Sequence, residues 1–354
     1  VLDDLTPLRE LAADLQGGRT GSLGSSGLGA ESAASPALLF TPRDVARGRA
    51  SPPMSEVNLT LPDPLPEGAL LSYALTTEVP DLSLEVLDAE GQVASQWGDG
   101  RRERGESGAT GPSFERRGTP LPTEAGFHRV AWPLRYARKG GVKAPPGEYT
   151  VRLRWEEGTL ERRFIVLPDP RDPSVTLADY QEQFRVTMEV HETSEAIREA
   201  LERIRDVRAQ AIGTVRRARE AERELGDLPR LADSMEIRLG LLEAELTSVD
   251  DSDVPTGVRR PRGSGLSQEY GTLFYYLNSG GGYGAGGSEG RPTSGVMERK
   301  RDLDRSWGAL RNRLETSLPS MVREFNAEVV RLGLEGIVIG GRAGDESGLD
   351  GRFR

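Results

Sequence analysis

The apolar residues of this sequence change their spacing at one proline-rich segment, LPDPRDPS, residues 167–174. Before it, Tyr149, Val151 and Leu153 alternate with polar or charged residues, a period typical of a strand with one buried face. After it, a stripe of residues recurs at separations of three or four, or multiples of that: Leu177, Tyr180, Phe184, Met188, His191, Leu201 and Ile204. This second spacing is typical of an amphipathic helix, so the sequence predicts a β region followed by an α region.

Seven short segments before residue 167 have the composition of strands: VNLTL (57–61), ALLSYAL (69–75), LSLEVLD (82–88), QVASQW (92–97), FHRVAWPLR (127–135), EYTVRLRW (148–155) and LERRFIV (160–166). Residues 88–91 and 156–158 have the composition of tight hairpin turns. Strands joined by turns, with no helix between them, indicate an immunoglobulin-like or fibronectin-III-like β-sandwich over residues 53–167. Its core is expected to contain Leu84, Val86, Val130, Trp132, Tyr149, Val151, Leu153, Phe164 and Val166.

Two segments around the expected sandwich are dominated by small and polar residues. GGRTGSLGSSGLGAESAAS (17–35) contains too few apolar side chains to offset the entropy of ordering, so we expect a flexible linker within residues 1–52. Residues 98–120 are polar and rich in arginine and glycine, and we expect a long insert of the disordered type within the sandwich.

The second half of the chain predicts an antiparallel helical bundle with long helices over residues 168–334, followed by a tail at 335–354 that begins with the apolar run GIVIG. The first helix is expected to end near Leu225, with Gly226 as its stop signal. A second helix begins after Asp227, a short one spans residues 266–279, and a fourth begins near Thr293. Pro319 is expected to kink the fourth helix or to restart it.

Composition excludes several functional classes. The net charge is −10 and the mean hydropathy is −0.50, which does not favour nucleic acid as a partner. The chain has no cysteine and only two histidines, so thiolate metal sites and three-histidine zinc sites are excluded. No run of 18 apolar residues is present, so no membrane-spanning helix is expected. The first residue is not methionine, and we expect a fragment or a processed product of a bacterial protein.

Three features are candidates for chemistry, and each has a plainer alternative. Asp250, Asp251 and Asp253 form a cluster that could bind calcium, but its spacing is not that of an EF-hand and fits a solvated acidic loop. The glycine-rich residues 280–287 could cradle a phosphate, but they lack the Gly-Lys-Ser/Thr ending and fit a helix connection. His191 lies on the helical stripe, where a core or interface histidine is the alternative to a catalytic one. We therefore assign no catalytic residue and no cofactor.

The tryptophans and the acidic residues are candidates for carbohydrate chemistry. Trp97, Trp132, Trp155 and Trp307 could stack on sugars, although tryptophans within strands are more often core residues. Glycoside cleavage needs two carboxyl groups about 5 to 10 Å apart. With 56 acidic residues, the sequence does not single out one pair.

The apolar stripes of the long helices must be covered, because amphipathic helices of this length are not stable alone in water. They can be buried by one another or by a partner. The residues that we assign to this interaction stripe are Tyr180, Phe184, Met188, His191, Trp307, Leu310, Leu314 and Phe325.

Several motifs together resemble the C-terminal region of bacterial secreted sortilin-type propeller proteins with BNR repeats, which are often labelled glycosyl hydrolase-like. The motifs are VLDDLTPLREL, LLFTPRDVAR, SPPM, LEVLDAEGQV, GFHRVAWPLRY, PPGEYTVRLRW, LPDPRDPSVTLADYQEQF and the turn GRPT that ends at Thr293. The resemblance covers most of the chain. It implies that residues 1–52 contain the exit from an N-terminal β-propeller, and that a sandwich and a helical bundle follow.

Because no catalytic constellation stands out, this architecture leads us to expect a non-catalytic, extracytoplasmic scaffold that is secreted, periplasmic or on the cell surface. It would pack on or orient a propeller of the same polypeptide, with self-association or an envelope protein as further partners. Two alternatives are a secreted hydrolase acting on glycans or peptides, of which this chain is a part, and a carbohydrate-binding module.

Overall fold

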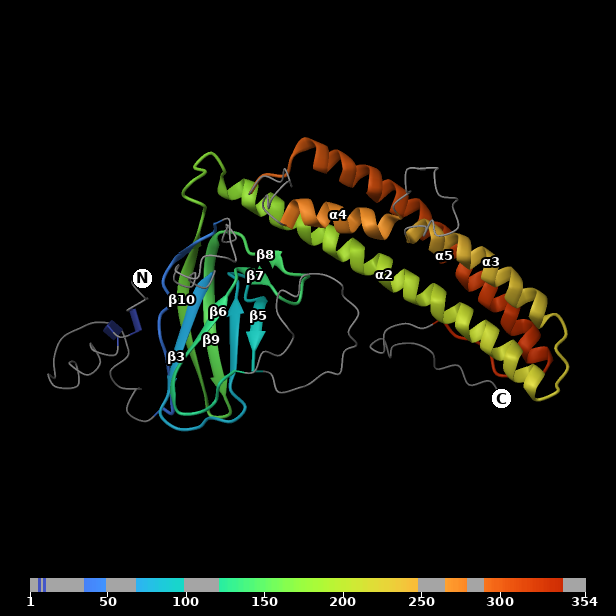
Figure 1. The fold of residues 1–354 in the computed structure, drawn as a ribbon, viewed down its shortest axis with the longest axis horizontal. Helices are drawn as coiled ribbons and strands as arrows, with labels where there is room; N and C mark the ends of the chain where they lie inside the picture. The colour runs from blue at the N-terminus through green and yellow to red at the C-terminus, as the bar shows by residue number, and fades with distance from the viewer. Residues whose placement is uncertain are drawn as a thin grey trace, which may run out of the picture. The chain divides into compact units, whose positions relative to one another are not determined.

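The computed structural model describes residues 35–48, 68–98, 121–247, 265–278 and 290–339, together with Thr6, Pro7, Arg9 and Glu10. The chain is a mixed β and α protein in which the strands come first (Figure 1). The strands are β1 (Ala37–Leu39), β2 (Val45–Ala46), β3 (Ala69–Leu75), β4 (Ser83–Leu87), β5 (Val93–Trp97), β6 (Gly126–Trp132), β7 (Arg135–Tyr136), β8 (Val142–Lys143), β9 (Gly147–Trp155) and β10 (Gly158–Leu167). The helices are α2 (Leu177–Glu220), α3 (Leu228–Leu246), α4 (Leu266–Asn278) and α5 (Ser294–Arg331).

The strands form a three-stranded sheet of order β1-β3-β6, a five-stranded sheet of order β2-β10-β9-β4-β5 and a small β7-β8 pair. Every pairing is antiparallel except that of β2 with β10. The two larger sheets contribute to one hydrophobic core, to which alternate residues of each strand point. All nine predicted core residues lie in this core or pack against it.

The hairpin turns form as the sequence predicts. Asp88 accepts hydrogen bonds at Oδ1 from the backbone N–H groups of Glu90 and Gln92, at 3.1 and 2.7 Å. Gly91 has a φ of 78°, which is favourable for glycine because it has no Cβ. Trp155 pairs with Gly158 at the second turn, between β9 and β10.

Two short strands lie within the region that we expected to be a leading segment and linker. Ala37–Leu39 pair with β3, and Val45–Ala46 pair with the end of β10. The expected start of the β region at residue 53 is therefore too late. The expected strand at 57–61, most of the expected insert at 98–120 and most of the linker at 17–35 lie outside the described residues.

The chain divides into two compact units, and their boundary differs from the one expected between residues 167 and 168. The β unit comprises Val1–Met188 and Leu277–Pro292, so it includes the first turns of α2 and the end of α4. The helical unit comprises Glu189–Tyr276 and Thr293–Arg354. Among the described helices, none combines the length and the apolar content that a membrane crossing requires.

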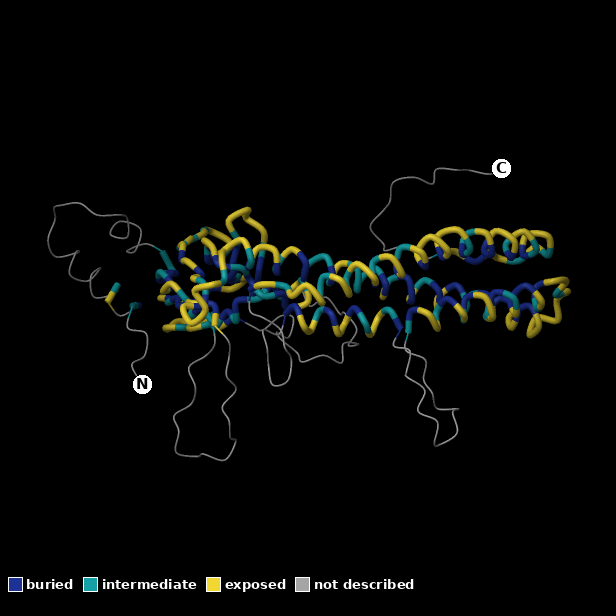
Figure 2. Tube along the Cα trace, turned by 90° about the horizontal axis from the view of Figure 1, so that it is seen from above, coloured by how far each residue is buried: buried dark blue, intermediate teal, exposed yellow. Residues whose placement is uncertain are grey.

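The long helices are amphipathic, and Figure 2 shows exposed residues along their outer sides and buried residues along their inner sides. The α2 helix ends at Glu220, earlier than expected, because Glu222 adopts a left-handed conformation with a φ of 51°. Arg223 N–H donates to the carbonyl of Ala218, and Glu222 N–H to that of Arg219, which is a Schellman arrangement. The α5 helix is not restarted at Pro319, which lies inside it.

Candidate functional site

The predicted interaction stripe is covered within the chain. Tyr180 is fully buried, and the ring of half-buried Phe184 lies 5.0 Å from that of Tyr136. Met188 is half-buried, as is His191, whose ring centroid lies 6.2 Å from that of Phe274. On α5, four stripe residues are buried: Trp307, Leu310, Leu314 and Phe325. These side chains therefore do not form an exposed surface for an external partner.

Two of the sequence-predicted ligand candidates fall on residues that the structure does not describe. Asp250, Asp251, Asp253 and the glycine loop 280–287 are outside the described residues. Within the described part of the chain, no group of three or more acidic or histidine side chains is arranged to hold a metal ion. The tryptophans do not form a sugar-stacking surface: Trp97, Trp132 and Trp307 are buried, and Trp155 is half-buried against the core.

In the described part of the β unit, a buried polar cluster surrounds Arg47, a residue that follows β2 and is only 3% exposed. Its Nη1 donates to the carbonyl oxygen of Ala144 at 3.1 Å, and its Nη2 donates to Oε1 of Gln183 on α2 at 2.6 Å. The guanidinium also lies 4.9 Å from the centroid of the Tyr180 ring, within the range of a cation–π interaction. A fully charged group is thus buried with specific acceptors.

Gln183 extends the cluster to two more segments. Its Nε2 donates to the carbonyl oxygen of Leu277 at 2.8 Å, and its Oε1 accepts a second hydrogen bond from Gly290 N–H at 3.2 Å. Next to Leu277, Asn278 accepts from Lys143 N–H at 2.9 Å and donates to the carbonyl oxygen of Gly141 at 3.0 Å. We call Arg47, Tyr180, Gln183 and Asn278 the arginine cluster.

The start of α2 is held by further polar contacts of the same unit. The Tyr180 hydroxyl accepts a hydrogen bond from Asp169 N–H at 3.2 Å, and the Asp169 carboxylate forms an ion pair with Arg171 at 2.8 Å. Asp179, in the first turn, accepts two hydrogen bonds from Arg291, each at 2.8 Å. These bonds from Arg291, with others from Thr176, lower the pKa of Asp179 well below its usual range.

The arginine cluster joins chain segments and leaves little space for a ligand. The depression bordered by Arg47, Lys143, Gln183 and Asn278 has no room for even a water-sized molecule. The polar contacts described above connect five segments of the sequence: the residue after β2, the residues around β8, the first turns of α2, the end of α4 and Gly290. Buried polar networks that are fully hydrogen-bonded fix one arrangement of the chain, because any other leaves charged or polar groups unpaired.

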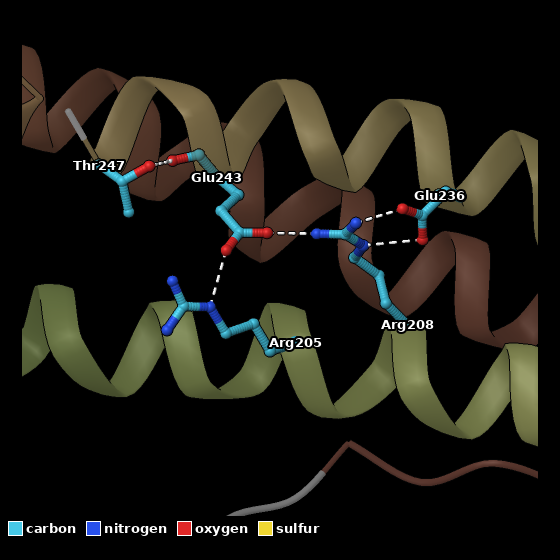
Figure 3. A network of polar contacts seen from close by, with 5 residues as sticks. All are labelled: Arg205, Arg208, Glu236, Glu243 and Thr247. Carbon is cyan, nitrogen blue, oxygen red and sulfur yellow. Dashed lines mark hydrogen bonds and ion pairs between the residues drawn. The ribbon is translucent and has the colours of Figure 1, made fainter. Parts of the chain in front are cut away.

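The helical unit has its own polar network between α2 and α3, shown in Figure 3. Arg208 binds both carboxylate oxygens of Glu236 and also contacts Glu243. Arg205 donates to the other oxygen of Glu243 at 2.7 Å. The hydrogen bond from Arg208 lowers the pKa of Glu236 below its usual value. The network holds two antiparallel helices in register and presents no unpaired nucleophile.

Sequence reasoning missed the arginine cluster. Arg47 lies in a region read as linker, and no local pattern indicates that its partners are about a hundred residues away. Gln183 did carry a signal: it lies three residues after Tyr180 and four before Thr187, on the buried face of the helix. A polar residue on such a face requires a hydrogen-bonding partner.

Comparison with known proteins gives only distant likeness. No protein-family model matches the chain, and no curated protein matches it. Two similar solved structures are CopC from Methylosinus trichosporium OB3b and the Ig-like domain of human leucine-rich repeat-containing protein 4. The first is 14% identical, with 37% of this chain and 94% of CopC covered and a TM-score of 0.18. The second is 16% identical, with 42% of this chain and 94% of that domain covered and a TM-score of 0.17.

Proposed function

We propose that this chain is a non-catalytic, extracytoplasmic scaffold that packs on or orients an N-terminal β-propeller of the same polypeptide. In this proposal the β unit is an immunoglobulin-like or fibronectin-III-like sandwich, and the helices form a bundle that spaces or presents further partners. The sequence motifs that resemble sortilin-type propeller proteins motivate the propeller. Two largely antiparallel sheets with one core are compatible with the sandwich.

The observation that carries the proposal is the contact between the N-terminal segment and the β unit. Glu10 accepts a hydrogen bond from the backbone N–H of Thr41 at 3.2 Å, and Pro7 is buried. A segment that leads out of a preceding domain would be fixed to the sheets by these contacts. The preceding domain would then be oriented relative to the sheets.

One face of the three-stranded sheet is suited to receive such a domain. Phe127 lies on the side of β6 that points away from the shared core, and its side chain is 50% exposed. Its ring lies 5.7 Å from that of Phe40, the residue before Thr41, and Arg129 lies 5.7 Å above the Phe127 ring. An exposed aromatic residue with a neighbouring arginine is a common anchor of protein interfaces.

The test begins with the gene region that precedes the codon for Val1. If that region encodes propeller repeats, it is produced separately and its binding to the present chain is measured by calorimetry and size-exclusion chromatography. We expect a one-to-one complex that Phe127→Asp weakens at least tenfold. Ile165→Asp, at a residue 41% exposed on the other sheet, is the matched control and should bind as the wild type does.

Other outcomes would contradict the proposal. An upstream region without propeller repeats, or a propeller that does not bind, removes the proposed partner. Hydrolysis of glycans or peptides by the isolated chain, screened on substrate panels, would favour the hydrolase alternative. A homo-oligomer, or capture of an envelope protein with no binding to the propeller, would assign the surface to a different partner.

A further inference from the structure

The last described segment of the chain, residues 334–339, continues from α5 without being helical. Gly333, with a φ of 63°, ends the helix, and the N–H of Leu334 donates to the carbonyl oxygen of Val329. The segment that follows contains most of the apolar run GIVIG noted in the sequence. It contacts two different helices of the helical unit, α2 and α5.

Asn326 on α5 binds one edge of this segment. Its Oδ1 accepts from the N–H of Ile337 at 2.8 Å, and its Nδ2 donates to the carbonyl oxygen of the same residue at 2.8 Å. A side-chain amide thus replaces the neighbouring strand to which Ile337 would be paired in a β-ladder.

Gln210 on α2 binds the opposite edge in the same way. Its Oε1 accepts from the N–H of Val338 at 2.9 Å, and its Nε2 donates to the carbonyl oxygen of Val338 at 2.9 Å. The backbone groups of successive residues in an extended chain point in opposite directions, so two amides on two helices can bind both edges. We call Gln210 and Asn326 the amide clamp.

The amide clamp binds the backbone of the segment, and the space around the segment limits which side chains it can carry. The side chain of Ile337 is 3% exposed, whereas that of Val338 is 68% exposed. A Cβ at Gly336 would lie 3.1 Å from Asn326 Oδ1 and 3.3 Å from its Cγ, closer than most side chains tolerate. The site therefore favours glycine, because a Cβ there would force Asn326 to shift; the next residue is a buried aliphatic one, and the side chain after it is exposed.

We propose that the amide clamp is a peptide-binding site, occupied in this structure by the chain's own residues 335–339. Its ligand is an extended segment of another polypeptide with glycine before an aliphatic residue. The four hydrogen bonds are made to backbone atoms, as in strand-addition complexes, so they do not depend on the ligand belonging to the same chain. The attached segment competes with a free one at an effective concentration of about millimolar.

The test uses a fluorescent peptide of the sequence LEGIVIGG, which is that of residues 334–341. Gly336→Val in the full chain should release the attached segment, and this variant should bind the peptide at least tenfold more tightly than the wild type. Glu335→Val, an exposed neighbour that makes no clamp contact, should bind as weakly as the wild type. Adding Asn326→Ala or Gln210→Ala to Gly336→Val should weaken binding about tenfold. A peptide with aspartate at the position of Ile337 should not bind.

Three results of the peptide-binding experiment would overturn the proposal. The first is a Gly336→Val variant of wild-type helicity that does not bind the peptide. The second is equal binding by the wild type, and the third is binding that Asn326→Ala and Gln210→Ala both leave unchanged. Hydrogen exchange of the wild type needs no substitution: the amides of Ile337 and Val338 should exchange more slowly than in the free peptide. Equal exchange rates would show that the clamp does not form.

Discussion

Replacing Arg47 with alanine should destabilise the β unit strongly, because the substitution removes a buried guanidinium that several other groups contact. The guanidinium donates to the carbonyl oxygen of Ala144 and to Gln183, and it lies over the ring of Tyr180. A hydrogen bond to a charged group contributes about 1.5–3 kcal/mol, and a desolvated cation–π contact contributes about 2 kcal/mol.

These contributions are not additive, because the acceptors share one donor group, so we expect the free energy of unfolding to fall by about 3 kcal/mol. A loss of this size raises the unfolding equilibrium constant roughly a hundredfold. With a urea dependence of about 2 kcal/mol per molar, the unfolding midpoint of the β unit should fall by about 1.5 M.

The assay is urea unfolding followed by tryptophan fluorescence in a Trp307→Phe background. The chain has four tryptophans, and the other three, Trp97, Trp132 and Trp155, all lie in strands of the β unit, so the signal then reports that unit alone. Arg43→Ala is the control, since Arg43 is exposed and lies four residues earlier.

The reasoning is refuted if the midpoints of Arg47→Ala and Arg43→Ala agree within error. That outcome would mean that the hydrogen bonds of the arginine cluster are replaced by water without loss.

Three further predictions concern the backbone and one surface carboxylate. Gly68→Ala should destabilise the β unit far more than Gly91→Ala, because a Cβ at Gly68 would lie 1.8 Å from a carbonyl oxygen of β6 whereas Gly91 has open space; urea midpoints compare the two. The pKa of Glu328 is lowered from 4.5 to about 2, chiefly by a hydrogen bond from Arg331. A pKa that is lower in the folded state stabilises the protein above pH 4.5, and this stabilisation is lost as the pH falls toward 2. The wild type should therefore lose more stability between pH 6 and pH 3 than Arg331→Leu does, and equal losses would contradict this assignment. Pro319→Ala should raise the free energy of unfolding of the helical unit by about 1–3 kcal/mol, and with it the Tm, because alanine restores a helical N–H. An unchanged or lower Tm in circular dichroism would show that α5 has adapted to proline.

The elements with a strong local period could be predicted from the sequence. Strands β9 and β10 and the core residues on them follow from strict alternation, since each strand has one face toward the core. The α4 helix follows from its apolar spacing and matches its predicted limits to within one residue, and α3 begins directly after Asp227, as predicted. Local spacing is a sufficient signal where burial repeats with the geometry of the element.

Features that depend on distant partners could not be predicted in this way. β1 and β2 contain three and two residues, too few to show a period, and each exists because a longer strand pairs with it. The sequence predicts that the first long helix ends near Leu225 with Gly226 as its stop signal, but the left-handed residue that ends α2 is Glu222, which has no glycine signal.

The candidate sites show the same limit. The apolar run GIVIG was visible in the sequence, but nothing near it indicates Gln210, which lies 128 residues away from its backbone partner Val338. Arg47 and Gln183 are likewise 136 residues apart. The tertiary fold determines such pairs. A side-chain amide or guanidinium can bind many acceptors, and the residues next to it in the sequence do not indicate which one it binds.

The path of α2 and the return of the chain at Leu277 limit how this protein could be dissected or assembled. Residues 189–276 leave the β unit, residues 277–292 return to it, and the chain leaves it again at Thr293, so neither unit is continuous in the sequence. A fragment that stops at Pro168 would retain Arg47 and lose both Gln183 and Asn278. Fusion of two independent genes end to end would not yield this topology. Neither unit can be moved to another protein as one continuous segment.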